Sequence, residues 1–117
     1  MKDNIILTKT YDFALRIVRL YIKLKDLKEF EISRQLLRSG TSIGANAEEG
    51  SVAQSKKDFI AKFSISLKET RETIYWLRLL KDSNLIDSLE ASRLICESEE
   101  IQRILTSILK TAKNNNN

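Results

Sequence analysis

The chain has 117 residues, which is enough for one domain with a single core. It contains no proline and is rich in Leu, Ile, Lys and Glu, a composition typical of an all-α fold. Its 20 basic and 16 acidic residues give a formal charge of +4, which permits contact with nucleic acid without requiring it. The absence of histidine excludes Ser-His-Asp triads, Cys-His pairs and His-containing zinc or di-iron sites.

The start of the chain and its single cysteine bear on location and redox chemistry. The apolar run at residues 5–7 is too short for a signal peptide or a membrane span, so we expect a cytoplasmic protein without a membrane partner. Cys96 is the only cysteine and can form no intramolecular disulfide. Its apolar neighbours predict that its thiol is buried and serves in packing. For the chain as a whole we expect no cofactor.

The first predicted helix covers residues 8–27, where apolar residues recur over an arc wider than one core contact needs. We therefore expect this helix to bury two faces. Its remaining face carries charged residues every three or four positions, namely Lys9, Asp12, Arg16, Arg19, Lys23 and Asp26. This face has two interpretations: a solvated surface with an Asp12–Arg16 ion pair, or a stripe that contacts phosphates.

A segment rich in small residues, 36–50, lies in a second predicted helix that begins near Ile32 after a connector at 28–31. The segment is either a loop that cradles a phosphate or a helix whose small residues let another backbone approach closely. It lacks the lysine of a Walker loop and the preceding strand of a dinucleotide loop, so we favour the helix. Asn46 should then hydrogen-bond a neighbouring group, and Gly50 should end the helix in a left-handed conformation. The motif residues are Ser39, Gly40, Ser42, Ile43, Gly44, Asn46, Glu49 and Gly50.

Two further helices complete the predicted fold. A capping box of Ser55 and Asp58 opens the third helix, which ends before Asn84. A cap at residues 87–88 opens the fourth helix, which continues to Ala112.

Four helices with short connectors predict an all-α fold, an up-down-up-down antiparallel four-helix bundle. We assign residues 1–112 to this single domain. Residues 113–117 have nothing to bury and are predicted to be a disordered tail.

Two Glu-x-x-Glu motifs, Glu69 with Glu72 and Glu97 with Glu100, offer an enzymatic alternative. Such pairs on adjacent helices can hold Mg²⁺ against a pyrophosphate, as in all-α nucleotide pyrophosphohydrolases. Helical geometry directs Glu69 and Glu72 away from the apolar stripe of their helix, beside basic residues. We therefore favour a solvated, salt-bridged face and expect no enzymatic activity.

Basic residues on the first two helices are the predicted nucleic-acid contacts, and they are Arg16, Arg19, Lys23, Arg34 and Arg38. The third helix carries a second basic stripe, formed by Lys57, Lys68, Arg71 and Arg78. Glutamates interleave with this second stripe, and no aromatic residue lies among its charges for base stacking. Any RNA contact there should therefore be to backbone phosphate.

Three segments, residues 35–50, 55–59 and 66–70, resemble the four-helix-bundle family encoded within intervening sequences of bacterial 23S rRNA genes. The likeness covers most of the chain in order and spacing. The family pattern around the asparagine usually reads Ser-Ile-x-x-Asn-Ile-Ala-Glu-Gly. This chain has Ala47 and Glu48 where Ile and Ala are usual, and it lacks the usual proline before the second helix.

The resemblance implies an up-down bundle that assembles as a ring-like homopentamer. It also implies kinship with the accessory variability determinant proteins of diversity-generating retroelements, which form similar basic barrels, bind nucleic acid and work with a reverse transcriptase. No enzymatic activity is attached to the family. The leading hypothesis is therefore a non-enzymatic homo-oligomer that binds RNA or DNA through phosphate contacts. The alternatives are a structural or protein-interaction scaffold and a Mg²⁺-dependent nucleotide pyrophosphohydrolase.

Overall fold

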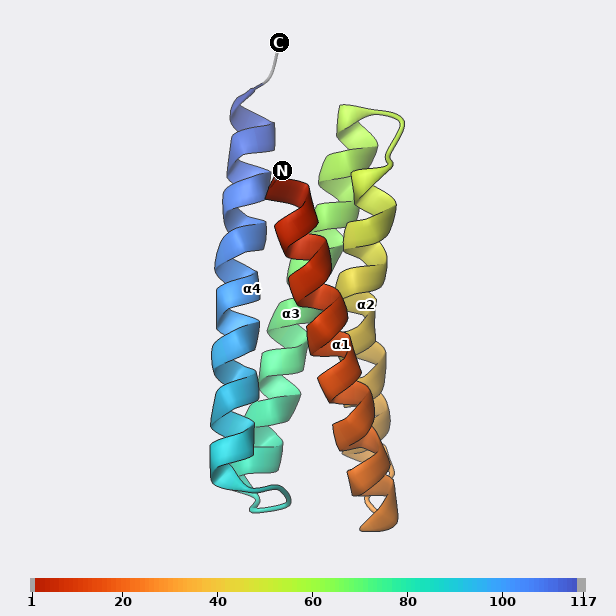
Figure 1. The fold of residues 1–117 in the computed structure, drawn as a ribbon, viewed down its shortest axis with the longest axis vertical. Coiled ribbons are helices and arrows are strands. Elements are labelled where there is room, and N and C mark those ends of the chain that lie inside the picture. The colour runs from red at the N-terminus through yellow and green to blue at the C-terminus, as the bar shows by residue number, and fades with distance from the viewer. Residues whose placement is uncertain (1, 116–117) are drawn as a thin grey trace.

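The computed structural model describes residues 2–115 of the chain, with side chains from residue 5 onward. These residues form four α-helices, α1 (Lys2–Asp26), α2 (Glu31–Ser51), α3 (Lys56–Asp82) and α4 (Ser88–Asn114). Each helix runs antiparallel to the one before it, in a molecule measuring 51 × 20 × 20 Å (Figure 1). The predicted all-α up-down-up-down bundle is confirmed. The last helix includes residues 113–114 of the predicted tail, whereas residues 116–117 lie outside the described part.

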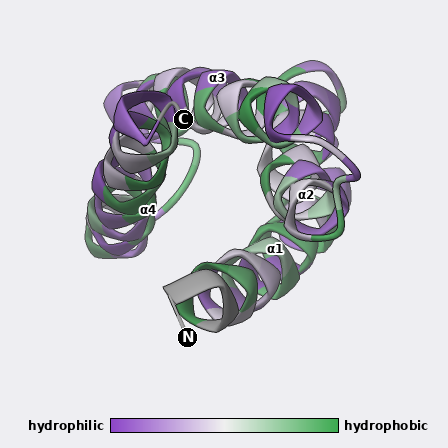
Figure 2. Cartoon of the chain, turned by 90° about the horizontal axis from the view of Figure 1, so that it is seen from above, coloured by the Kyte–Doolittle hydropathy of each residue, from purple (hydrophilic) through white to green (hydrophobic). Residues whose placement is uncertain are grey.

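The helices lie around one long axis in chain order, and one of the seams between neighbouring helices differs from the others. α2 packs extensively on both α1 and α3, and α3 packs extensively on α4. α1 and α4 touch much less. Seen from above, the four helices trace a horseshoe whose open side lies between α1 and α4 (Figure 2). The bundle therefore has three closely packed seams and one loose seam.

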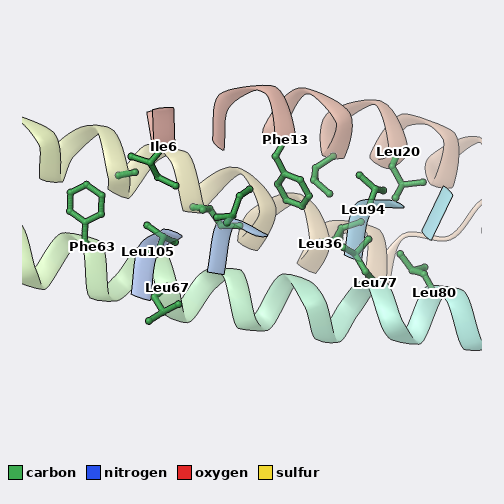
Figure 3. Packing of buried hydrophobic residues seen from close by; sticks show 14 of the residues in the cluster. Ile6, Phe13, Leu20, Leu36, Phe63, Leu67, Leu77, Leu80, Leu94 and Leu105 are labelled. Carbon is green, nitrogen blue, oxygen red and sulfur yellow. The ribbon is translucent and has the colours of Figure 1, made fainter. Parts of the chain in front are cut away.

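Apolar residues at helical spacing fill the core. In α1, Phe13, Ile17 and Leu20 recur every three or four positions and are almost completely buried. The other helices contribute further buried residues, among them Leu36, Phe63, Leu67, Leu77, Leu94 and Leu105 (Figure 3). Removing this surface from water supplies the stabilisation that isolated helices lack.

The glycines of α2 allow α1 to approach closely. A Cβ atom at Gly40 would lie 2.8 Å from Cγ2 of Ile17, and one at Gly44 would lie 3.2 Å from Oγ1 of Thr10. Both distances are shorter than an ordinary van der Waals contact, so larger residues would push α1 away. Residues 36–50 are helical throughout, and the predicted close approach of another helix is confirmed.

Gly50 has a different role from the predicted one. α2 continues to Ser51, and none of the glycines, all of which are described, has a positive φ. The prediction that Gly50 ends the helix in a left-handed conformation is therefore wrong. A Cβ atom at Gly50 would lie 2.7 Å from the Phe63 ring. This glycine is required because an aromatic ring of α3 packs directly on the backbone of α2.

Side chains close several helix ends. Ser55 and Asp87 accept hydrogen bonds from backbone amides in the first turns of α3 and α4, at 3.0 and 3.1 Å. Asn84, at φ 61°, follows α3 in the left-handed conformation typical of a helix end. These features confirm the predicted boundaries of α3 and the predicted start of α4. α1, in contrast, begins at Lys2, six residues before its predicted start, and α4 ends two residues beyond the predicted Ala112. An unpredicted cap opens α2, where the Glu29 carboxylate accepts from the amides of residues 32–33 at 3.2 and 2.8 Å.

Candidate nucleic-acid interface

A ladder of three ion pairs joins α1 to α4. The pairs are Lys9–Glu100, Arg16–Glu97 and Lys23–Glu90, and we call them the ladder. The nitrogen-to-oxygen distances of the two lysine pairs are 3.2 and 3.1 Å, and Arg16 donates from Nε and Nη2 to the two oxygens of Glu97. The three cations are seven residues apart, or about two helical turns, which places them on one face of α1.

The ladder changes the interpretation of the charged face of α1. Arg16 pairs with Glu97 of α4, and the described residues contain no ion pair between Arg16 and Asp12. The predicted ion pair within α1 is therefore wrong. The partner of Arg16 comes from a helix that is distant in sequence, because α4 lies alongside this face.

A groove of about 900 Å³ lies beside the ladder, between α1 and α4. Four arginines and four carboxylates line it, together with Leu89, Leu94 and Cys96. The arginines are Arg16, Arg19, Arg93 and Arg103, and the carboxylates are Asp87, Glu90, Glu97 and Glu100. Within residues 5–115, Arg19, Arg93 and Arg103 form no ion pair. All three side chains are exposed.

The ladder also indicates where these arginines lie along the long axis of the groove. Because Lys23 lies opposite Glu90 and the helices are antiparallel, Arg19 and Arg93 lie at about the same level. Arg103 is ten residues further along α4, about 15 Å away along the helix axis. The groove therefore presents cations at two separate levels.

The five predicted nucleic-acid contacts lie on two surfaces. Arg16, Arg19 and Lys23 lie at the α1–α4 seam. Arg34 pairs with Glu31 of its own helix at 3.8 Å, and Arg38 pairs with Glu72 of α3 at 3.7 Å. The α2 arginines therefore do not extend the stripe of α1. That any of the five binds nucleic acid stays a prediction.

The prediction from sequence does not include Arg93 and Arg103, although one signal points to them. Leu89, Arg93, Cys96, Glu100 and Arg103 recur at spacings of four, three, four and three, so they share one face of α4. Cys96 is exposed on this face, and the predicted buried thiol is wrong. Its apolar neighbours in sequence point elsewhere because adjacent helical residues differ in direction by about 100°.

The Glu-x-x-Glu motifs lie at different seams. Glu72 contacts α2 and accepts a hydrogen bond from Trp76 Nε1 at 3.0 Å. Glu97 and Glu100 belong to the ladder, on the other side of the bundle. Within residues 5–115, no group of three or more His, Cys, Asp or Glu side chains could hold a metal ion.

Glu69 is not on a solvated face as predicted. Its side chain is only 9% exposed, and its Oε1 atom has no hydrogen-bond partner among the described residues. The reason is its position on α3 between Ser66 and Thr73, whose hydroxyl groups both bond to α2. Packing of α2 against this side of α3 covers the carboxylate.

Polar residues of the small-residue motif are engaged within the bundle. Asn46 Nδ2 donates to the carbonyl and hydroxyl oxygens of Ser42 at 2.9 and 3.0 Å, so the predicted bond to a neighbouring group is confirmed. Glu49 lies 2.8 Å from Nζ of Lys62 on α3. The hydrogen bond and charge of Glu49 raise the pKa of Lys62 above its ordinary value. These contacts give the motif a structural role.

Two apolar stripes are exposed on α1 and α3. The α1 stripe consists of Tyr11, Leu15, Val18 and Ile22, and the α3 stripe consists of Ile65, Tyr75 and Leu79. Each of these side chains is between 37% and 58% exposed. The spacing of four, three and four places the α1 stripe on one helical face. The apolar arc of α1 is therefore as wide as predicted, and its outer part is uncovered in the single chain.

Comparison with known proteins identifies the family. The family model described as 23S rRNA-intervening sequence protein matches residues 2–107. The chain belongs to this family. Its fold also matches the crystal structure of a protein of unknown function from the S23 ribosomal protein family of Bacteroides thetaiotaomicron. The two chains are 49% identical with a TM-score of 0.90, and the match covers 94% of this chain and 99% of the other.

Two further findings concern function and membranes. The comparison with curated proteins found no match for this member of the 23S rRNA-intervening sequence protein family. In the described part of the chain, no helix has the length and hydropathy that a membrane span requires. The family membership confirms the resemblance in residues 35–50, 55–59 and 66–70.

Proposed function

We propose that this chain forms a non-enzymatic homo-oligomer that binds RNA or DNA through phosphate contacts in the groove between α1 and α4. One observation carries the proposal. Arg19, Arg93 and Arg103 line the same groove, and none has an ion-pair partner within residues 5–115. Guanidinium groups match phosphate oxygens in both charge and geometry, so these side chains suit a polyanionic ligand.

The lining of the groove favours contact with the backbone of a nucleic acid. Its side chains are Arg, Asp, Glu, Leu and Cys, which offer no aromatic face for base stacking. Phosphate contacts position a nucleic acid without reading its sequence. Binding should therefore depend weakly on sequence and strongly on salt.

The two apolar stripes support assembly. α1 and α3 lie on opposite sides of the molecule (Figure 2). The α1 stripe of one copy can therefore pack on the α3 stripe of a second copy, whereas the two stripes of one chain cannot meet. A contact between two different faces is head-to-tail, and it closes into a ring when the rotation between copies divides a full turn. The homopentamer implied by the family resemblance has this kind of symmetry. By the same resemblance, a reverse transcriptase is a further candidate partner.

A titration with a structured RNA tests the binding. The triple variant Arg19→Gln/Arg93→Gln/Arg103→Gln removes the three groove arginines that form no ion pair within residues 5–115. It should lower the affinity for RNA at low salt by at least about tenfold. Its matched control, Lys25→Gln/Lys28→Gln/Lys56→Gln, removes the same charge from exposed positions that lie outside the groove and outside both predicted basic stripes. Fluorescence anisotropy at several salt concentrations gives both the affinity and the salt slope.

The control should lose less than about threefold, and the salt slope of the groove variant should be shallower by about two to three. Equal losses in the two variants would show that only net charge matters. If the unmodified protein bound no RNA even at low salt, the nucleic-acid function would be wrong.

Light scattering tests the assembly. Leu15→Glu/Ile22→Glu places two charges in the α1 stripe and should lower the measured mass to that of the monomer, because charges are excluded from apolar interfaces. Val52→Glu is the control, since Val52 is 78% exposed and lies outside both stripes. A mass that is unchanged in the stripe variant would contradict this interface.

A protein-interaction scaffold is the second candidate function, and the exposed stripes favour it. In that case the oligomers would ignore nucleic acid and would retain a protein partner in a pull-down. The two functions differ in one result, namely whether duplex or structured RNA binds at low salt.

A further inference from the structure

We propose that the ladder carboxylates Glu90 and Glu97 compete with nucleic-acid phosphates for Lys23 and Arg16, so that the ladder sets the affinity of the groove. This inference rests on the function proposed above. It assigns a role to the acidic residues of the seam, which phosphate binding by arginines alone does not require.

The position of the ladder makes the competition direct. Arg16 and its partner Glu97 both line the groove, as does Glu90, the partner of Lys23. A phosphate in the groove therefore lies next to both members of a pair. The guanidinium of Arg16 holds Glu97 through two nitrogens, and phosphate oxygens can accept the same two hydrogen bonds. Phosphate and carboxylate cannot occupy the same donors together.

Water reaches the ladder, so exchange of its partners does not require the core to open. The side chains of Arg16 and Glu97 are 44% and 34% exposed, and those of Lys23 and Glu90 are 62% and 34% exposed. Exposed ion pairs contribute little to stability because water and salt screen them. A ligand with many phosphates can therefore replace the carboxylates one pair at a time.

The loose packing of α1 on α4 permits this exchange. The ladder cations lie on a different face of α1 from Phe13, Ile17 and Leu20, which are buried in the core. α1 also packs extensively on α2, and the ladder residues take no part in that contact because they pair with α4. Loss of the ladder partners thus releases cations without removing buried apolar surface.

The balance of charge in the groove makes the carboxylates decisive. Four arginines and four carboxylates line it. Lys23 is not among the lining residues, but it lies beside the groove because it pairs with Glu90. A polyanion that enters this lining meets both attraction and repulsion. Neutralising Glu90 and Glu97 halves the number of carboxylates in the groove, which weakens the repulsion, and frees two further cations for phosphate contact.

Two double variants that remove the same charge test the inference. Glu90→Gln/Glu97→Gln neutralises two ladder carboxylates. Glu48→Gln/Glu99→Gln neutralises two exposed carboxylates that do not line the groove and form no ion pair within residues 5–115. The affinity for a short fluorescein-labelled RNA duplex is measured by anisotropy at low salt. The ladder variant should bind about tenfold tighter than the unmodified protein, and the control less than about threefold tighter.

Cys96 supplies a second measurement on the same samples. It is the only cysteine and lines the groove, so a bound duplex should slow its alkylation by N-ethylmaleimide in both the unmodified protein and the ladder variant. Alkylation at an unchanged rate in the complex would overturn the inference, because the duplex would then be bound elsewhere.

The outcomes separate this inference from the proposed function. If the unmodified protein binds duplex but the ladder variant binds no tighter, the competition is wrong and the nucleic-acid function stands. Equal gains in both double variants would also overturn the competition, because net charge would explain them. If the unmodified protein binds no duplex at low salt, the proposed function fails and this inference fails with it.

Discussion

Polar residues serve opposite purposes at the α2–α3 seam and at the α1–α4 seam. At the first, Ser66 Oγ donates to the backbone oxygen of Ile43 at 2.7 Å, and Thr73 Oγ1 donates to Ser39 Oγ at 2.9 Å. All four residues are buried. At the second seam, the polar contacts are the charged and water-exposed pairs of the ladder. Short neutral side chains let helices approach closely, whereas the long charged ones bridge two helices that touch much less.

The difference teaches where this fold is fixed and where it can change. A buried hydroxyl has no water to bond with, so a shift of one helix would leave it without a partner. A charged group at the surface exchanges one partner for another at little cost. The α2–α3 seam is therefore fixed, and the α1–α4 seam is the part suited to a charged ligand.

The largest expected effect comes from breaking the close approach of α1 to α2. Gly40→Leu would place a branched side chain where even a Cβ atom lies 2.8 Å from Ile17, so α1 must move outward. We expect a loss of about 3 kcal/mol in the free energy of unfolding, measured by denaturant titration. Gly44→Leu should act in the same way against Thr10, whose Oγ1 atom would lie 3.2 Å from a Cβ atom at Gly44.

Ala45→Leu is the matched control for Gly40→Leu, because Ala45 is exposed on the same helix. It should change the free energy of unfolding by less than about 0.5 kcal/mol. Similar stabilities for Gly40→Leu and Ala45→Leu would show that the bundle does not require a residue without a side chain at position 40, where α1 approaches α2.

A smaller effect is expected from a single hydroxyl of the α2–α3 seam. Ser66→Ala removes the hydrogen bond to Ile43 and should lower the free energy of unfolding by about 1 kcal/mol. Ser107→Ala is the control, since Ser107 is exposed and lies on α4. If the two variants lost equal stability in denaturant titration, the hydroxyl would have no special role at the seam.

The helices and the small-residue face of α2 are predictable from sequence because they depend on local spacing. A residue repeat of three and four positions determines which side chains share a face, whatever the partner helix is. Asn84 and the caps at Ser55 and Asp87 are recognisable for the same reason, since a helix end is set by a few adjacent residues.

The parts that sequence does not predict depend on which helix covers which face. Cys96 is exposed and Glu69 is buried, the reverse of what the sequence predicts. Glu69 is buried because α2 covers the side of α3 that holds it. Glu97 is the partner of Arg16 although 81 residues separate them. The ring of Phe63, from the next helix, fills the space that a side chain at Gly50 would need. None of these contacts leaves a signal within a single turn of its own helix.

The smallest expected loss of stability comes from the α1–α4 seam, and its dependence on salt best distinguishes this seam from the α2–α3 seam. Glu97→Gln removes the charge of the central ladder pair, and because both partners are partly exposed we expect a loss of less than about 1 kcal/mol in the free energy of unfolding. That loss should shrink further as salt is added, since salt screens exposed charges. The loss caused by Ser66→Ala should be independent of salt, because no charge is removed. A Glu97→Gln loss that exceeded the Ser66→Ala loss and persisted in high salt would mean that the α1–α4 seam is as firmly fixed as the seams of α2.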